Sequence, residues 1–507
     1  MSAAMLLPLV YLVVRTLGAG AEVIELLLRL RTLAVAGRTM LLILGVVGAC
    51  MLLSVPLAWL TARTDLPLRR FWTVATALPL VMPSYVVGLT VLAALGPKGL
   101  LQRLLERLIG VDRLPDIYGF PGALLTIVLI SYPLTTLTIR AALQRMDRRL
   151  EEVSYSLGRS RWRTFLRITL PQLRPSIASG TLLVALYTLR DFGAVSLLRY
   201  ETFTWAIYLQ YQTSFNRSVA AGLSLVVLAV AVCFLFLESR TRSPSSYYRG
   251  GAGAPRAAST VHLGKWKWPA LIFCTGLVFC SLILPLSVLI YWLVLGAMRG
   301  ETLGLVWGPA LNSIFVSVLA ALAAGLLSFP VAFVTVRSPG WLAGIAEKST
   351  YIGYTLPGIV VALALAFFGA NVLPMVYQSL GLLLFAYVIL FLPLSLGAVR
   401  SSLMQVNPNL EEAARSLGRS PLRVLRSVTL PLVRPGVLAG SSLVFFTAMK
   451  ELPATLILSP IGFKTLAVSI WSAATEAFFA RAAAPALLLI LVSAIPITLF
   501  TLREERA

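Results

Sequence analysis

The sequence predicts an all-α integral membrane protein with about 12 transmembrane helices, arranged as two parallel six-helix repeats. Of its 507 residues, 58% are hydrophobic and 12% are charged, whereas a soluble domain has roughly 25% charged residues. Apolar runs of about 17 to 25 residues recur along the chain, and each can cross a hydrocarbon core as a helix. Because backbone amides in lipid must be satisfied internally, a helical bundle follows. A polar segment that recurs 260 residues later indicates the repeat.

Twelve apolar runs are the expected spans. They lie near 4–17, 39–62, 71–95, 119–139, 176–198, 219–237, 268–296, 308–334, 344–370, 376–398, 436–458 and 482–502. The first is short and could be a signal-peptide core, but no basic region precedes it and no small-residue cleavage site follows. We therefore expect an uncleaved helix there.

The net charge of +23 is spread between the apolar runs, which argues against nucleic-acid binding and indicates topology. Basic residues follow spans two, four and six and close the chain: Arg63, Arg69, Arg70; Arg140, Arg145, Arg148, Arg149, Arg159, Arg161, Arg163, Arg167; Arg240, Arg242, Arg249, Arg256, Lys265, Lys267; Arg503, Arg506. With both termini in the cytoplasm, all of these segments fall inside. The segment 18–37, with Arg29 and Arg31, is the exception on the outside.

The cysteines and the histidine predict no metal site. Cys50, Cys233, Cys274 and Cys280 lie in apolar runs without metal-site spacing, so we expect them to be packing residues. The single histidine, His262, lies between the two repeats, and no role is predicted for it.

The chain divides into a first repeat over 1–237, a cytoplasmic linker over 238–267 and a second repeat over 268–507. The linker is rich in Gly, Ala, Ser, Pro and Arg. In the repeats, the polar segment reads EEVSYSLGRSRWRTFLRITLPQLRPS from Glu151 and EEAARSLGRSPLRVLRSVTLPLVRPG from Glu411. Half of the positions are identical, mostly polar residues, glycine and proline. An even number of spans separates the copies, so both face the cytoplasm.

Each copy predicts a polar helix–turn–helix, which we call knob 1 (140–175) and knob 2 (400–435). Asp147 in knob 1, and Asn407 with Pro408 in knob 2, suit the start of the first short helix. Gly158 and Gly418 permit the positive φ that ends it.

The second short helix of each knob has its own signals. Ser160, and Ser420 with Pro421, are its expected caps, and Leu-Pro at 170–171 and 430–431 is expected to stop it before the next span. One such loop could merely connect spans. Two copies at equivalent places indicate a shared binding surface for a two-fold partner.

The knobs resemble the signature cytoplasmic loop of ABC importer permeases, E-A-A-x₃-G-x₉-I-x-L-P. Knob 2 matches with Val for Ile through Glu412-Ala413-Ala414, Gly418, Val428 and Leu430-Pro431; knob 1 matches through Glu152, Gly158, Ile168 and Leu170-Pro171, with Val153 and Ser154 for the alanines. The resemblance implies the MetI-like fold. It also implies that eight residues couple the chain to an ATPase: Glu151, Glu152, Leu157, Gly158, Glu411, Glu412, Leu417 and Gly418.

Other segments look like the fused permeases of bacterial ferric-iron importers. They are Ile117-Tyr118-Gly119-Phe120, Arg190 to Tyr200 with Thr202-Phe203-Thr204, and Lys450 to Thr455. Similar fused permeases carry thiamine, and unfused relatives carry sulfate, molybdate or polyamines. The resemblance implies the permease subunit of an ATP-driven importer in the bacterial cytoplasmic (inner) membrane, with ferric iron as the expected solute and thiamine, another inorganic ion or a polyamine as alternatives.

The same resemblance implies the partners. They are an extracytoplasmic solute-binding protein and two copies of a cytoplasmic ABC ATPase, besides membrane lipid, and no nucleic acid. No G-x-x-x-x-G-K-[ST] pattern occurs in the sequence, so ATP and Mg²⁺ are expected on the partner ATPase, and this chain is expected to be no enzyme and to hold no cofactor.

Two rival classes remain. A major-facilitator-type secondary transporter also has six plus six parallel helices, and Asp65, Arg69 and Arg70 faintly suggest its signature loop, but it needs no ATPase-docking knobs. A membrane anchor without transport leaves the acidic residues of spans five and eleven unexplained. Co-purification with an ATPase would separate all three classes.

The substrate pathway is expected at Asp191 and Glu451, which occupy equivalent places in spans five and eleven. Each follows a basic residue, Arg190 or Lys450. Because an ionisable side chain is costly against lipid, both should face the bundle interior or an aqueous cavity. They could pair with basic residues and hold the helices in register. Alternatively they form a transient metal site for ferric iron, a hard cation that prefers oxygen ligands, with Tyr187 near.

Overall fold

The computed structural model describes residues 2–18, 25, 29–110, 115–146, 149–213, 217–241, 261–300, 306–338 and 340–504. Within these ranges the chain is almost entirely helical, and its one β-bridge pairs Thr64 with Val261. The helices form two compact units. Unit 1 comprises Met1–Leu33, Phe203–Leu228 and Trp292–Pro496; unit 2 comprises Ala34–Thr202, Ala229–Tyr291 and Ile497–Ala507.

Many of the helices can cross a membrane. Seven helical stretches of the described chain are long and apolar enough: Leu30–Arg63, Ser84–Ile109, Phe120–Gln144, Gly264–Met298, Trp307–Arg337, Leu380–Gln405 and Pro421–Met449. Shorter apolar helices accompany them: Ala4–Gly18, Ala220–Phe234, Gly358–Val372, Leu466–Thr475 and Phe479–Ala494. The predicted all-α membrane class is confirmed.

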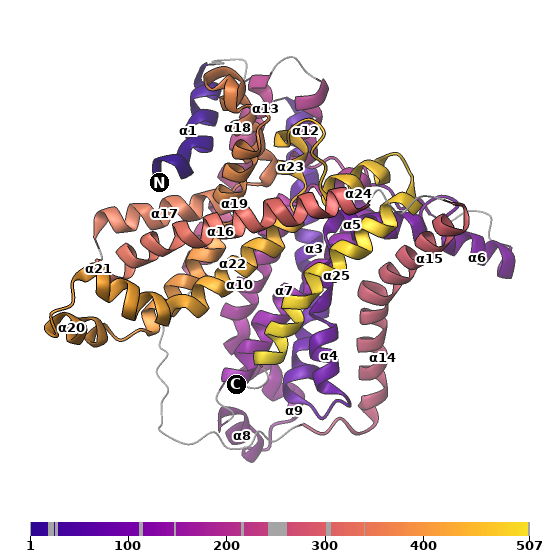
Figure 1. The fold of residues 1–507 in the computed structure, drawn as a ribbon. Helices are drawn as coiled ribbons and strands as arrows, with labels where there is room; N and C mark the ends of the chain where they lie inside the picture. Colours follow the sequence, from indigo (N-terminus) through magenta and orange to yellow (C-terminus); the bar gives the residue numbers. More distant parts are fainter. Residues whose placement is uncertain are drawn as a thin grey trace. The chain divides into compact units, whose positions relative to one another are not determined.

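Unit 2 is built around α3 (Leu30–Arg63), α7 (Phe120–Arg145) and α10 (Leu170–Arg190), and α7 and α10 pack along each other (Figure 1). The Ser54 hydroxyl of α3 donates to the carbonyl of Tyr132 in α7 at 2.9 Å. Unit 2 also contains the helices α4 (Arg69–Ala75), η1 (Leu78–Val81), α5 (Ser84–Leu95), α6 (Leu100–Ile109) and α11 (Gly193–Leu197).

Unit 1 repeats this plan with α16 (Trp307–Arg337), α19 (Leu380–Gln405) and α22 (Leu430–Met449), which pack pairwise (Figure 1). Around them lie α17 (Trp341–Thr355), α18 (Gly358–Val372), η6 (Pro374–Val376), α23 (Pro453–Leu458), α24 (Leu466–Thr475) and α25 (Phe479–Glu504). The helix α18 packs on α23, as α5 packs on α11 in unit 2.

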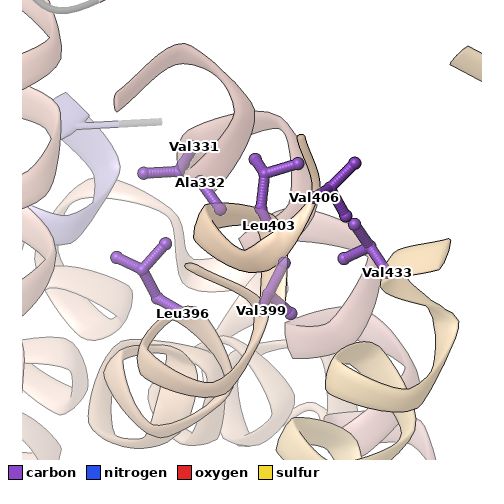
Figure 2. Packing of buried hydrophobic residues seen from close by; sticks show 7 residues of the cluster. All are labelled: Val331, Ala332, Leu396, Val399, Leu403, Val406 and Val433. Atoms are coloured by element: carbon purple, nitrogen blue, oxygen red, sulfur yellow. The ribbon is translucent and has the colours of Figure 1, made fainter. Parts of the chain in front are cut away.

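Equivalent residues fill the two cores. In unit 1, Figure 2 shows the buried cluster Val331, Ala332, Leu396, Val399, Leu403, Val406 and Val433. In unit 2 the cluster is Ala58, Ile139, Leu143 and Leu173. Three of the latter lie 260 residues before Val399, Leu403 and Val433, the offset that relates the two knobs. The internal repeat is therefore a repeat of packing as well as of sequence.

The first helix of each sequence repeat packs in the unit that the other repeat mainly builds. In unit 1, α1 (Ser2–Gly18) lies on α17 and α18, and the Tyr11 hydroxyl donates to the Phe367 carbonyl at 3.2 Å. In unit 2, the helix α14 (Lys267–Val278) continues through the π turn η4 (Phe279–Ile283), and Ser281 Oγ lies 3.3 Å from the Tyr132 hydroxyl. Units of packing and repeats of sequence thus differ.

Two expected spans are interrupted at prolines. The run 71–95 forms α4, η1 and α5, and the run 344–370 forms α17 and α18. Met82 and Leu356, which precede Pro83 and Pro357, are extended, with ψ of 129° and 133°. The expectation of continuous helices was wrong there, because the proline ring disfavours a helical conformation in the residue before it.

Leu-Pro does not stop the second short helix of either knob, contrary to expectation. In knob 1, α9 (Arg161–Thr164) passes through the π turn η2 (Phe165–Thr169) into α10. In knob 2, α21 (Pro421–Val424) passes through η7 (Leu425–Thr429) into α22. The helix widens into a π turn directly before each proline, and this widening accommodates the proline ring and its missing N–H without ending the helix.

Most of the predicted linker, residues 242–260, lies outside the described residues. Its start belongs to α13 (Arg217–Thr241), and its end includes η3 (Gly264–Trp266) just before α14. The intervening repeat boundary therefore stays a prediction from sequence.

Asp65 holds the described end of the linker. Its backbone N–H donates to the Val261 carbonyl at 3.2 Å. Its carboxylate accepts the Leu263 N–H at 2.9 Å and lies 3.1 Å from His262 Nδ1 and 3.0 Å from Lys267 Nζ. These contacts hold the pKa of Asp65 well below its usual range, the Leu263 hydrogen bond contributing most. His262, for which the sequence predicted no role, thus belongs to this anchor.

Candidate functional sites

In knob 1, a polar turn joins the short helix α8 (Arg149–Ser156) to α9. Gly158 has a φ of +75°. Its N–H donates to the Tyr155 carbonyl at 2.9 Å, and the Arg159 N–H donates to the Ser154 carbonyl at 3.1 Å. This pair of bonds is a Schellman motif, which satisfies the last carbonyls of α8. The predicted left-handed glycine is confirmed.

Knob 2 has the same local structure. Its first helix is α20 (Pro408–Ser416), and the Asn407 side chain caps it by accepting the Asn409 N–H at 3.0 Å. Gly418 has a φ of +80° and closes an equivalent Schellman motif. Asp147, the expected counterpart of Asn407, lies outside the described residues.

The turn of each knob presents a large apolar side chain to its surroundings. Leu157 is 73% exposed and Leu417 is 83% exposed. Glu152 and Glu412 are exposed too. Further exposed apolar side chains on the knobs include Leu150, Val153, Tyr155, Trp162 and Leu166 in knob 1, and Leu410, Leu422 and Leu430 in knob 2. Apolar side chains gathered on a polar turn are typical of a protein-docking surface.

Glu151 and Glu411 differ from the other predicted coupling residues because they contact the helical bundle. Glu411 is only 5% exposed and accepts hydrogen bonds from Arg337 and Thr429. Glu151 accepts a hydrogen bond from Thr169 at 2.8 Å. Each glutamate pair thus has one member facing inward and one facing outward.

Asp191 lies where α10 ends, so the expected span 176–198 is not one continuous helix. The side chain is buried, and its Oδ1 accepts the backbone N–H groups of Ala194 at 3.0 Å and Val195 at 3.4 Å, in the first turn of α11. Ser84, the first residue of α5, hydrogen-bonds to both Asp191 and Tyr187. Tyr187 therefore lies near Asp191, as expected.

Glu451 has the equivalent place in unit 1, and the expected span 436–458 is likewise broken after Met449. Its Oε1 accepts the Ala454 N–H at 3.2 Å, in the first turn of α23. The same oxygen lies against Gly358, the first residue of α18, so a Cβ at that position would require the carboxylate to move. Both carboxylates therefore bond a short helix and abut a longer one.

The predicted pathway residues belong to different units. Asp191, Arg190 and Tyr187 lie in unit 2, and Glu451 and Lys450 in unit 1. Arg190 is the last residue of α10, and Lys450 directly follows α22. Among the described residues, no group of three or more His, Cys, Asp or Glu side chains gathers as a metal site. A site shared by the two carboxylates stays a prediction.

Sequence reasoning missed the partners of these residues. Ser84 and Gly358 each follow a proline that starts a buried helix, and Arg63 and Arg337 each end the second long helix of their repeat. The signals were present, in Pro-Ser, Pro-Gly and an arginine after an apolar run. They do not indicate which distant carboxylate lies opposite.

Comparison with known proteins gives the family. The model of the "Binding-protein-dependent transport system inner membrane component" family matches the chain twice, at residues 54–240 and 317–506. The "Fe(3+)-transport system permease protein FbpB 2" of Haemophilus influenzae is 36% identical over 499 residues, which cover 97% of this chain and 94% of that protein.

More distant relatives match in part. The "Ferric transport system permease protein FbpB" of Actinobacillus pleuropneumoniae is 26% identical over an alignment that covers 75% of this chain and 58% of that protein. The "Molybdenum transport system permease protein ModB" of Escherichia coli is 35% identical over an alignment that covers 40% of this chain and 91% of that protein. Since the family model covers both repeats and one relative aligns along nearly the whole length, the chain belongs to the family of binding-protein-dependent transport system inner membrane components.

Proposed function

We propose that the chain forms the translocation pathway of an ATP-driven importer and that its solute is ferric iron, delivered by an extracytoplasmic binding protein. The assignment of ferric iron as the solute rests on the alignment over 97% of the chain with a protein named for Fe(3+) transport. The paired knobs support ATP hydrolysis by a partner as the energy source, because a secondary transporter has no use for two equivalent docking turns.

The two knobs receive one ATPase subunit each. The exposed side chains of Glu152 and Leu157 in knob 1, and of Glu412 and Leu417 in knob 2, make the contact. A two-fold ATPase dimer matches two equivalent surfaces on one chain. ATP and Mg²⁺ are bound by that partner, and this chain supplies the membrane helices that its closure moves.

Oxygen-rich breaks in α10 and α22 suit ferric iron in kind. Asp191, Tyr187 and Ser84 supply oxygen atoms in unit 2, and Glu451 does so in unit 1. A sparse set of oxygen ligands binds a hard cation without trapping it. The Asp191 and Glu451 carboxylates accept the cation in passing.

The test of the function is transport by purified components. The chain should co-purify with an ABC ATPase, and liposomes containing both should take up ferric iron only with the binding protein outside and ATP inside. Thiamine, molybdate and a polyamine, each with the same binding protein, are the comparison solutes. Uptake of one of these and not of iron would keep the importer and change its solute; ATP-independent uptake would support the secondary-transporter class.

From the distribution of Lys and Arg we infer that both knobs, the linker and both termini lie in the cytoplasm and that the loop 96–117 lies outside. A cysteine at Ser245 in the linker should then resist a membrane-impermeant thiol reagent in intact cells, in a variant whose four native cysteines are alanine. For the outside we choose Ile109→Cys, 70% exposed, rather than the following Gly110, whose φ of +68° disfavours a side chain. Labelling of the cysteine at 245 and not of the cysteine at 109 would show the opposite orientation in the membrane.

A further inference from the structure

One buried carboxylate joins three segments in unit 1. Glu411 Oε1 accepts two hydrogen bonds from the Arg337 guanidinium, from Nη2 at 3.1 Å and from Nε at 3.3 Å. It accepts a third from the Thr429 hydroxyl at 3.0 Å. Arg337 ends α16, Glu411 lies in α20 of knob 2, and Thr429 ends the π turn that leads into α22. Only 7% of the Glu411 side chain and 13% of the Arg337 side chain are exposed.

The equivalent residues of unit 2 keep the threonine hydrogen bond, and the arginine and the glutamate form an ion pair. Glu151 Oε1 accepts the Thr169 hydroxyl at 2.8 Å and lies 4.0 Å from Nη2 of Arg63. Arg63 ends α3, and Thr169 ends the π turn before α10. In both units the glutamate thus lies between a threonine that bonds it and an arginine that forms an ion pair with it, so this placement is a feature of the repeat.

We propose that Glu151 and Glu411 are positioning residues that carry the movement of each knob into two membrane helices at once, an inference that rests on the proposed coupling function. Their outward neighbours, Glu152 and Glu412, face the ATPase. The adjacent acids thus divide two tasks, because side chains one position apart on a helix point in different directions.

The geometry suits transmission. The α22 helix runs unbroken from Leu430 to Met449, about 30 Å at 1.5 Å per residue, and ends beside Glu451. Arg337 also donates to the Val406 carbonyl at 3.0 Å, and Figure 2 shows Val406 in the core cluster with Leu403. Buried charge-assisted hydrogen bonds are directional and strong, so this junction resists bending more than an apolar contact does.

The threonines allow a test that spares the charges. Thr169→Val with Thr429→Val removes both hydroxyls and keeps the side-chain shape, whereas Thr169→Ser with Thr429→Ser keeps the hydroxyls. The assembled importer, with ATPase and iron-loaded binding protein, is measured in liposomes. We expect the valine pair to retain the ATPase on purification but to lose about tenfold of its stimulation by the loaded binding protein. The serine pair should keep that stimulation.

Ser427→Ala is the matched control, because Ser427 is an exposed hydroxyl of the same π turn that bonds Arg419 instead of the glutamate. It should be stimulated like the unaltered chain. Normal stimulation of the valine pair, or loss of the ATPase from it, would overturn the positioning role. If the unaltered chain neither bound an ATPase nor responded to a binding protein, the proposed function itself would fail.

Discussion

Replacing both Gly158 and Gly418 with valine should abolish solute-dependent ATP hydrolysis while the bundle stays folded. Both glycines adopt a left-handed φ, +75° and +80°. A side chain in that conformation costs roughly 1 to 2 kcal/mol per residue, and a β-branched one is the least tolerated. Relief of that strain breaks the Schellman bonds and moves the exposed Leu157 and Leu417 away from their docking positions.

The measurement is ATP hydrolysis by the reconstituted complex with and without loaded binding protein. Gly158→Asn with Gly418→Asn is the control, because asparagine adopts the left-handed region more readily than most residues with a side chain, and it should stay close to the unaltered rate. A Cβ added at either glycine would have no neighbouring heavy atom within 4 Å, so steric crowding does not complicate the comparison. Full activity of the valine pair would show that the knobs do not couple the ATPase.

Asp191→Asn with Glu451→Gln should stop ferric-iron import and leave assembly unchanged. Each substitution keeps a side-chain oxygen that can accept the N–H of Ala194 or of Ala454, so both breaks retain their caps. The charge is lost, and with it the attraction for a trivalent cation. Iron uptake and complex yield are measured together, on the same preparation.

Asp191→Ala is the contrasting variant. It removes the acceptor as well as the charge, and the loss of a helix cap costs about 1 kcal/mol, so its thermal stability should fall below that of Asp191→Asn. If the charge-neutral pair imports iron at the normal rate while the alanine variant is destabilised, the two carboxylates are structural caps only and the pathway lies elsewhere.

The sequence by itself determined the membrane class, the internal repeat and both knobs. Membrane spans follow from composition, because a polar backbone in lipid permits few structures. The knob turns follow from single residues, because Gly158 and Gly418 are needed wherever the chain must take a positive φ. Such features depend on residues a few positions away in the chain, so the amino-acid sequence alone is sufficient to predict them.

Only the tertiary structure decided what the charged residues touch. Adjacent and chemically identical, Glu411 and Glu412 nonetheless differ: Glu411 contacts Arg337, 74 positions earlier in the chain, and Glu412 is exposed. The breaks at Asp191 and Glu451, and the packing of α1 in the unit built mainly by the second repeat, are decided in the same way. A contact between distant residues depends on the direction of two helices in space, and hydropathy and local propensity carry no information about that direction.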